Sequence, residues 1–168
     1  RGRVEENNGE RPEPVAICRL KRVAADHKGD VRARLPAVAP RNGKRVACIG
    51  AGPASLTVAR DLAPQGYDVT VFDGGAKAGG FMRSQIPRFR LPESVIDEET
   101  AQVLDLGVDF RSGQRIDSMQ ALLGQGYDAV FVGCGAPRGR ELDVTGRAEA
   151  AAANHIGNDW PASVSLDH

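Results

Sequence analysis

The 168-residue sequence lacks several features that mark particular classes of protein. No stretch approaches the roughly 18 consecutive apolar residues of a membrane span, and the first residues contain no apolar core of a signal peptide. We therefore expect no membrane span, and the cytoplasm is the default location. A hydrophobic content of 41% with 26% charged residues is typical of folded soluble chains. The length suffices for one domain.

Patterns of metal ligands are also missing. Cys18, Cys48 and Cys134 are far apart, none belongs to a CxxC pair, and the three histidines are scattered. The sequence therefore indicates neither a zinc site nor an iron–sulfur cluster within this chain. We expect the three cysteines to be buried structural thiols.

Charge is balanced overall but not along the chain. The first 44 residues contain 11 Lys and Arg against 6 Asp and Glu, whereas the remainder contains 11 against 16. The positive surplus is spread too thinly for a dense basic patch. We therefore expect an ordinary solvated face, and no nucleic-acid partner.

The pattern of apolar residues, prolines and glycines predicts three parts. Residues 1–43 contain a short amphipathic helix and then a linker interrupted by Pro36, Pro40 and Gly43, which together make a helical arm. Residues 44–146 read as an α/β domain. Residues 147–168 show no clear period, and we predict no structure for them.

The α/β domain alternates apolar strands with helices, which predicts a Rossmann-like, doubly wound parallel sheet. Two segments, VDFRSG and MQALLGQG, are left unassigned, and residues 74–92 are too rich in Gly, Pro and Arg for a regular element. The predicted strands are residues 45–50, 67–73 and 127–132, and the predicted helices are residues 53–66 and 92–107, the latter starting at Pro92.

A glycine-rich turn, IGAGPASL, links the first strand to the next helix. Gly50 permits a tight turn, Gly52 lets the backbone approach a pyrophosphate, and Ser55 takes the third position, where a small residue lets helix and strand pack closely. The unpaired amides at the helix start attract phosphate charge. Asp73, 23 residues after Gly50, ends the second strand and is placed to bind an adenosine ribose.

This combination favours a dinucleotide site over a turn without a ligand. Gly74 and Gly75 follow Asp73, so no Arg is present to receive a 2′-phosphate, and FAD or NAD remains as the ligand. Further along, Gly80 permits a close backbone approach and Arg83 is a charge-assisted donor suited to a pyrophosphate.

Four blocks resemble the pyridine nucleotide-disulfide oxidoreductase superfamily, and more closely the small subunit of bacterial glutamate synthase and its NAD(P)H-dependent relatives. They are VACIGAGPASLTVARDL, YDVTVFD, AGGFMRSQIPRFRLPESVID and YDAVFVGCGAPRGRELDVTG. The resemblance implies that residues 44–146 are the first part of an FAD-binding domain. The segment EPVAICRLKRVAADH, with ENN before it, looks like the tail of the family's helical iron–sulfur domain.

The resemblance also implies a role for individual residues. It places Cys134 and Gly135 at a glycine-rich strand end that lines the cofactor. It implies that Asp73 binds the adenosine ribose of FAD, that Ile86 and Pro87 lie toward the flavin, and that the backbone of Arg115 and Ile116 contacts the adenine. The residues implied to lie around the pyrophosphate are Gly50, Gly52, Pro53, Ala54, Gly80 and Arg83.

Members of this family pass a hydride from NAD(P)H to FAD and then single electrons to iron–sulfur centres, so no acid–base residue is needed. The chain would be the FAD module of such an oxidoreductase, with the clusters and the rest of the subunit or complex outside it. No second glycine fingerprint for NAD(P)H follows residue 140, which indicates a fragment or a truncated relative. The alternative is a non-catalytic assembly module that keeps the fold, and a compact NAD-binding dehydrogenase ranks below both.

Overall fold

The computed structural model describes residues 15–136, 139, 145–146 and 149. The chain divides into two compact units, Arg1–Pro36 and Ala37–His168. The ENN segment and nearly all of the predicted tail over residues 147–168 lie outside the described residues.

The first unit contains helix α1 (Ile17–Asp26) and a short 3₁₀ turn, η1 (Arg32–Arg34). The predicted helix is therefore present, and the predicted linker includes one turn of 3₁₀ helix. Arg22 pairs with Asp26 one helical turn later at 2.8 Å. No residue of α1 is buried, and its apolar side chains remain exposed.

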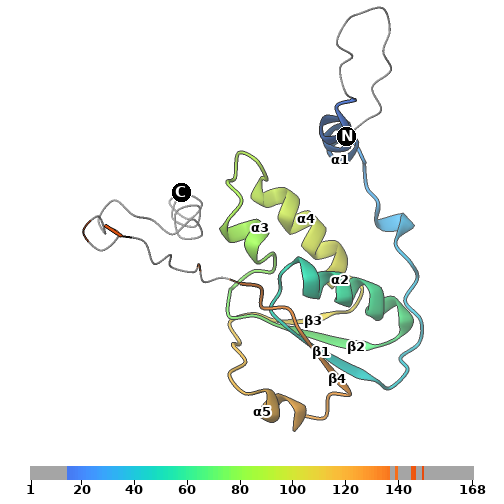
Figure 1. Ribbon diagram of the computed structural model, residues 1–168. Helices are drawn as coiled ribbons and strands as arrows, with labels where there is room; N and C mark the ends of the chain where they lie inside the picture. Colours follow the sequence, from blue (N-terminus) through green and yellow to red (C-terminus); the bar gives the residue numbers. More distant parts are fainter. Residues whose placement is uncertain (1–14, 137–138, 140–144, 147–148, 150–168) are drawn as a thin grey trace, which may run out of the picture. The chain divides into compact units, whose positions relative to one another are not determined.

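The second unit contains a parallel four-stranded sheet with the order β3-β2-β1-β4 (Figure 1). Its strands are β1 (Arg45–Ile49), β2 (Asp68–Phe72), β3 (Asp109–Arg111) and β4 (Ala129–Val132). The predicted Rossmann-like parallel sheet is confirmed. The chain adds β2 and β3 on one side of β1 and β4 on the other, and parallel sheets bind ligands at the carboxyl ends of strands where this order reverses.

Helices cover both faces of this sheet (Figure 1). Helices α2 and α4 pack together over one face, and α5 lies on the other. The helical segments are α2 (Pro53–Leu62), η2 (Ala63–Gln65), α3 (Phe81–Ser84), α4 (Glu93–Leu104) and α5 (Met119–Leu123).

The side chains of β1 and β2 are buried on both faces, which explains their continuous apolar runs. On the α5 face, Leu122 packs with Ala47, Phe72 and Tyr127. The rings of Phe72 and Tyr127 meet edge to face, with centroids 6.1 Å apart. The Arg45 guanidinium lies 4.5 Å from the centre of the Tyr127 ring. This cluster anchors the short helix α5 to the sheet.

Three short elements were not assigned from the sequence. The segment VDFRSG contains the edge strand β3, MQALLGQG contains α5, and the irregular stretch over residues 74–92 contains the single turn α3. Each is five residues or shorter and has at most one buried residue, so its apolar pattern is weak. Pro92 is the N-cap of α4, so the helix begins at Glu93, one residue after the predicted start.

The prediction of buried thiols is right for Cys48 and wrong for Cys18 and Cys134, which are exposed. Cys18 lies on α1, where no residue is buried, and Cys134 lies beyond the end of β4. Burial raises the pKa of the Cys48 thiol to about 11, so this thiol stays protonated at neutral pH. Among the described residues, no group of three metal-ligating side chains comes together, and no helix is long and apolar enough to span a membrane.

Candidate dinucleotide-binding site

The turn between β1 and α2 requires glycine at position 50. Gly50 has φ +92°, which side chains other than hydrogen rarely permit. A Cβ there would lie 2.7 Å from the carbonyl oxygen of Gly133. The Gly50 N–H donates to the carbonyl of Phe72 at 2.7 Å. The turn is therefore held between the ends of β2 and β4.

Gly52 leaves open space in front of the N-terminus of α2. It is the N-cap residue, and no side chain caps the helix. A Cβ on Gly52 would have only the Gly133 oxygen near it, at 3.9 Å. Pro53 occupies the first helical position, where its missing N–H costs nothing, and Ala54 follows it. The Leu56 N–H makes the first bond of the helix, to the Gly52 carbonyl at 3.0 Å, whereas the amides of Ala54 and Ser55 before it have no intrahelical acceptor, so an anionic phosphate fits here.

The second glycine segment packs directly against this turn. The Gly79 N–H donates to the carbonyl of Ala51 at 2.8 Å. Gly80 has φ +52°, and a Cβ there would lie 2.8 Å from the Cα of Gly52. The structure thus brings Gly50, Gly52 and Gly80 together around the start of α2. We call the space that they surround the cradle: the glycine turn forms its first wall, and Gly80 forms the second.

Asp73 lies at the end of β2, beside the glycine turn. One carboxylate oxygen accepts the Ala51 N–H at 2.6 Å, and the other accepts the Gly75 N–H at 2.7 Å. Each carboxylate oxygen can accept a second hydrogen bond, so ribose hydroxyls can still be bound. Asp73 therefore also holds the glycine turn in place.

The loop after β3 runs alongside Asp73. The Gln114 N–H donates to the Asp73 carbonyl at 2.9 Å. Arg115 lies next to Gly74, its side chain is exposed, and its guanidinium pairs with Asp117 at 3.0 Å. Ile116 packs against the apolar cluster beneath the sheet. The contact of this loop with adenine remains a prediction, but its position beside Asp73 is compatible with it.

Cys134 and Gly135 follow β4, at the carboxyl ends of the strands, where the glycine turn and Asp73 also lie. The Gly133 N–H donates to the carbonyl of Ile49 at 2.8 Å, and the Cys134 sulfur lies 3.7 Å from that oxygen. Gly135 has φ +67°. The end of β4 therefore lies against the glycine turn, as the closeness of Gly133 to Gly50 also shows.

Ser55 and Gly133 share one space beneath the turn. Ser55 is fully buried, and its hydroxyl has no hydrogen-bond partner among the described residues. A Cβ on Gly133 would overlap with that hydroxyl oxygen. The serine at the third position of the turn is therefore accommodated because position 133 has no side chain.

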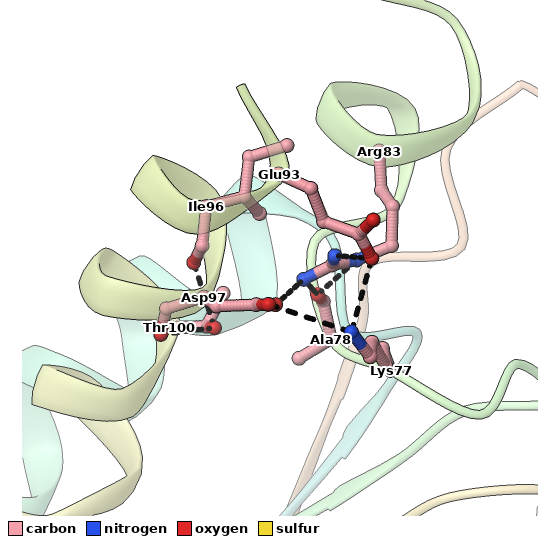
Figure 2. Close-up of polar contacts among 7 residues, drawn as sticks. All are labelled: Lys77, Ala78, Arg83, Glu93, Ile96, Asp97 and Thr100. Atoms are coloured by element: carbon pink, nitrogen blue, oxygen red, sulfur yellow. Dashed lines mark hydrogen bonds and ion pairs between the residues drawn. The ribbon is translucent and has the colours of Figure 1, made fainter. Parts of the chain in front are cut away.

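Arg83 is engaged in a charged network rather than pointing freely into the cradle (Figure 2). Its guanidinium donates twice to the carbonyl of Ala78, at 3.0 and 2.9 Å. It also donates to Glu93 at 2.8 Å and to Asp97 at 2.6 Å. The ammonium of Lys77 bridges the same two carboxylates at 3.0 and 3.4 Å. The predicted contact of Arg83 with a pyrophosphate stays a prediction.

The two residues assigned to the flavin side lie between α3 and α4. Ile86 is exposed and Pro87 is half-buried, and the Pro87 carbonyl accepts the N–H of Arg90 at 2.8 Å. Ile86 lines a shallow hollow together with Met82 and Leu91.

Sequence reasoning missed the acidic partners of this network. Glu93 and Asp97 are four residues apart at the start of α4, so they face the same side of the helix. Hydrogen bonds from Lys77 to Glu93, and from Arg83 to Asp97, are the main causes that lower the pKa of each carboxyl. The four-residue spacing of Glu93 and Asp97 was the available signal that the two carboxylates share one side of a helix. It did not show that Lys77 and Arg83 are the cations on that side.

The fold and the site define a Rossmann-like domain of the dinucleotide-binding class. Residues 48–110 match the family described as "NAD(P)-binding Rossmann-like domain". The matched range contains the glycine turn, Asp73 and the charged network.

Curated relatives extend this match over more of the chain. One is the NAD-dependent dihydropyrimidine dehydrogenase subunit PreT homolog of Salmonella typhi, 34% identical over 131 residues, which are 77% of this chain and 32% of the relative. The NADP(+)-dependent formate dehydrogenase subunit beta of Moorella thermoacetica is 35% identical over an alignment that covers 97% of this chain and 27% of the relative. The glutamate synthase [NADPH] small chain of Bacillus subtilis is 33% identical over 138 residues, 79% of this chain and 28% of the relative.

Solved structures share the fold. Histamine dehydrogenase from Rhizobium sp. 4-9 matches with a TM-score of 0.50 and 25% identity, over 65% of this chain and 17% of that chain. A 2-naphthoyl-CoA reductase matches with a TM-score of 0.54 and 21% identity, over 71% of this chain and 18% of that chain.

Residues 48–110 therefore match an NAD(P)-binding Rossmann-like domain, and the chain is similar to the glutamate synthase small chain and to PreT. The resemblance recognised in the sequence is confirmed. The chain spans about a third or less of the length of these curated relatives.

Proposed function

We propose that residues 44–136 bind FAD and serve as the flavin module of an NAD(P)H-linked oxidoreductase. The observation that carries this proposal is the open space at Gly52, in front of the uncapped N-terminus of α2. Backbone amides and the helix dipole there suit a pyrophosphate. Asp73 lies beside the same turn, with acceptor sites left for a ribose.

FAD is proposed ahead of NAD because the four sequence blocks resemble the FAD-binding part of the glutamate synthase small subunit. The name of the matching domain family refers to NAD(P), and both cofactors contain the adenosine and pyrophosphate that this cradle suits. When bound, FAD would accept a hydride and release single electrons. The residues of this chain would position it, and none of them needs to act as an acid or base.

The larger activity belongs to a longer protein or complex in this proposal. Since the chain spans a third or less of its relatives, the rest of such a protein would supply the NAD(P)H site and the contact with iron–sulfur centres. The isolated chain should then bind FAD without oxidising NADPH at an appreciable rate.

A titration of FAD, followed by flavin fluorescence, tests this proposal. We expect saturable binding that Gly52→Ala weakens by at least about tenfold, because a methyl group would occupy the phosphate space. The fold should tolerate this change at a cost of about 1 kcal/mol or less, since the site is open and only an N-cap preference is lost.

Gly124→Ala is the matched control for this titration. Gly124 also has a negative φ, of −62°, and a Cβ there would make only ordinary contacts at the end of α5. This variant should bind FAD as the unmodified chain does. Equal affinity in the Gly52→Ala variant would contradict the proposed site.

A second function is favoured by the hydrogen bonds of Asp73. Both of its carboxylate oxygens accept backbone amides of the protein, so the turn is held in shape by the chain itself. A non-catalytic assembly module that keeps the fold without a cofactor could retain this arrangement. A purified chain that neither contains nor takes up flavin, nor binds NAD, would favour this second function.

A further inference from the structure

Four charged residues link the loop before α3 to the start of α4 (Figure 2). Lys77 and Arg83 provide the positive charges, and Glu93 and Asp97 provide the negative ones, with nitrogen–oxygen distances of 2.6 to 3.4 Å. The Arg83 side chain is the least accessible of the four, at 18% exposed. We call this set the α4 clasp.

The clasp is connected to the glycine turn by a short series of hydrogen bonds. Arg83 donates two hydrogen bonds to the carbonyl of Ala78, which is itself buried. The next residue, Gly79, donates its N–H to Ala51 inside the turn. Gly80 then lies against the Cα of Gly52. The position of the second cradle wall therefore depends on where Arg83 holds the Ala78 carbonyl.

The guanidinium has little capacity left for a ligand. Four of its five N–H groups are used by Ala78, Glu93 and Asp97. A direct contact with a pyrophosphate through these groups would break charge-assisted bonds that hold α3 and α4 together. The side chain is therefore better suited to shaping the cradle than to filling it.

We propose that Arg83 is a positioning residue of the dinucleotide site: Glu93 and Asp97 hold its guanidinium, and it acts through the Ala78 carbonyl to hold Gly79 and Gly80 against the glycine turn. This inference rests on the proposed function, because it concerns the same cradle. It replaces the expected contact of Arg83 with phosphate by an indirect role, and it assigns a role to two carboxylates on α4 that bind Arg83 and Lys77.

A double-mutant cycle separates the two roles of Arg83. If Asp97 holds Arg83 in the position from which it binds Ala78, Arg83→Met and Asp97→Asn each weaken FAD binding by about tenfold, and the double variant is no weaker than the worse single one. Arg83→Lys should restore only part of the affinity, because an ammonium cannot reach Ala78 and both carboxylates in the same geometry. If Arg83 instead contacts the phosphate, Asp97→Asn leaves affinity unchanged or raises it, which would overturn the proposal.

Amide hydrogen exchange tests the clasp without any cofactor. In the ligand-free chain, the Gly79 amide should exchange about tenfold faster in both Arg83→Met and Asp97→Asn, because its hydrogen bond to Ala51 opens more often. Lys44→Met is the matched control, since it breaks a comparable ion pair with Asp128 near the opposite ends of the strands. It should leave Gly79 exchange unchanged.

The two measurements also separate this inference from the proposed function. A chain that binds no FAD but shows faster Gly79 exchange in both clasp variants contradicts the FAD proposal and leaves the positioning of the cradle wall supported. Unchanged Gly79 exchange in both variants overturns the positioning role, whatever the affinity for FAD.

Discussion

Ser55 shows how a single residue changes the packing beneath the glycine turn. Its hydroxyl is buried, has no partner among the described residues, and occupies the space that a side chain at position 133 would need. A buried hydroxyl without a hydrogen bond is destabilising by about 1–3 kcal/mol. The pair Ser55 and Gly133 therefore has to be treated as one packing unit.

We expect Ser55→Ala to raise the free energy of unfolding by about 1 kcal/mol, because it removes the unpaired hydroxyl and leaves the helix intact. Gly133→Ala should lower it by about 1–3 kcal/mol through overpacking against Ser55. Urea denaturation of each variant measures both effects.

The double variant Ser55→Gly with Gly133→Ala provides the control for this pair. It should cost less than the sum of its two single changes, since the methyl group enters space that the serine has left. Additive costs would show that the two positions do not share a space.

At the level of residues, spacing predicted Gly50, Gly52 and Asp73 because their conformational and chemical demands are local. The partners of Arg83 could not be predicted in this way. Its contacts depend on the path of the irregular segment between α3 and α4, which periodicity does not determine. The exposure of Cys134 was missed for a similar reason, because an apolar run does not show where the last strand leaves the core.

Among the elements, α3 and α4 are joined by ion pairs that depend on pH. Hydrogen bonds from Lys77 to Glu93 and from Arg83 to Asp97 hold the pKa of both carboxyls below the ordinary values. The unfolded chain therefore binds protons more readily than the folded one at these sites. The contribution of these ion pairs to the free energy of unfolding is complete above the ordinary carboxyl pKa of about 4, and it is lost as the pH falls below that value.

We expect the urea midpoint of the unmodified chain to fall as the pH is lowered from about 6 to about 3. The double variant Glu93→Gln with Asp97→Asn should show a shallower fall, because two of the responding carboxyls are absent. Both carboxylates are partly exposed, so the difference should be modest and should shrink at high salt. Parallel pH profiles for the two proteins would contradict this account of the clasp.

The main elements of the sheet could be predicted because parallel strands covered on both faces are continuous apolar runs. Strands β1 and β2 show this pattern, and helices α2 and α4 show a helical period. Strand β4 is also an apolar run, but it lies at the sheet edge and none of its residues is buried, so the expectation of a buried strand there was wrong. Strand β3 has only three residues, with the apolar Phe110 between the charged Asp109 and Arg111, and therefore gives no apolar run. Thr100 is a buried polar residue within α4, and its hydroxyl donates to the carbonyl of Ile96 at 2.8 Å, which satisfies it.

At the scale of the whole molecule, the chain consists of two compact units that meet in sequence at Pro36. Residues 37–43, predicted to be part of the linker, belong to the second unit. Ala39 donates to the carbonyl of Pro64, and Asn42 donates to that of Gly66, each at 2.9 Å. The assignment of the first unit to the tail of an iron–sulfur domain stays a prediction.

We expect a chain of residues 37–168 to unfold at the same urea concentration as the full chain, because the sheet and its helices lie within the second unit. A peptide of residues 1–36 should show little helix by circular dichroism, since α1 has ten residues and none is buried. A large loss of stability on removal of residues 1–36 would show that the two units fold as one.

The central claim is that the turn between β1 and α2 holds the pyrophosphate of an adenine dinucleotide. Mapping backbone amide chemical shifts by NMR during additions of FAD, and separately of NAD, tests it most directly. The account predicts that FAD shifts the amides of Gly50, Gly52, Ala54 and Gly80 most strongly, with smaller shifts at residues 113–116 and unchanged signals in α1. Shifts that avoid the glycine turn for both ligands, or that spread evenly over the surface, would contradict it.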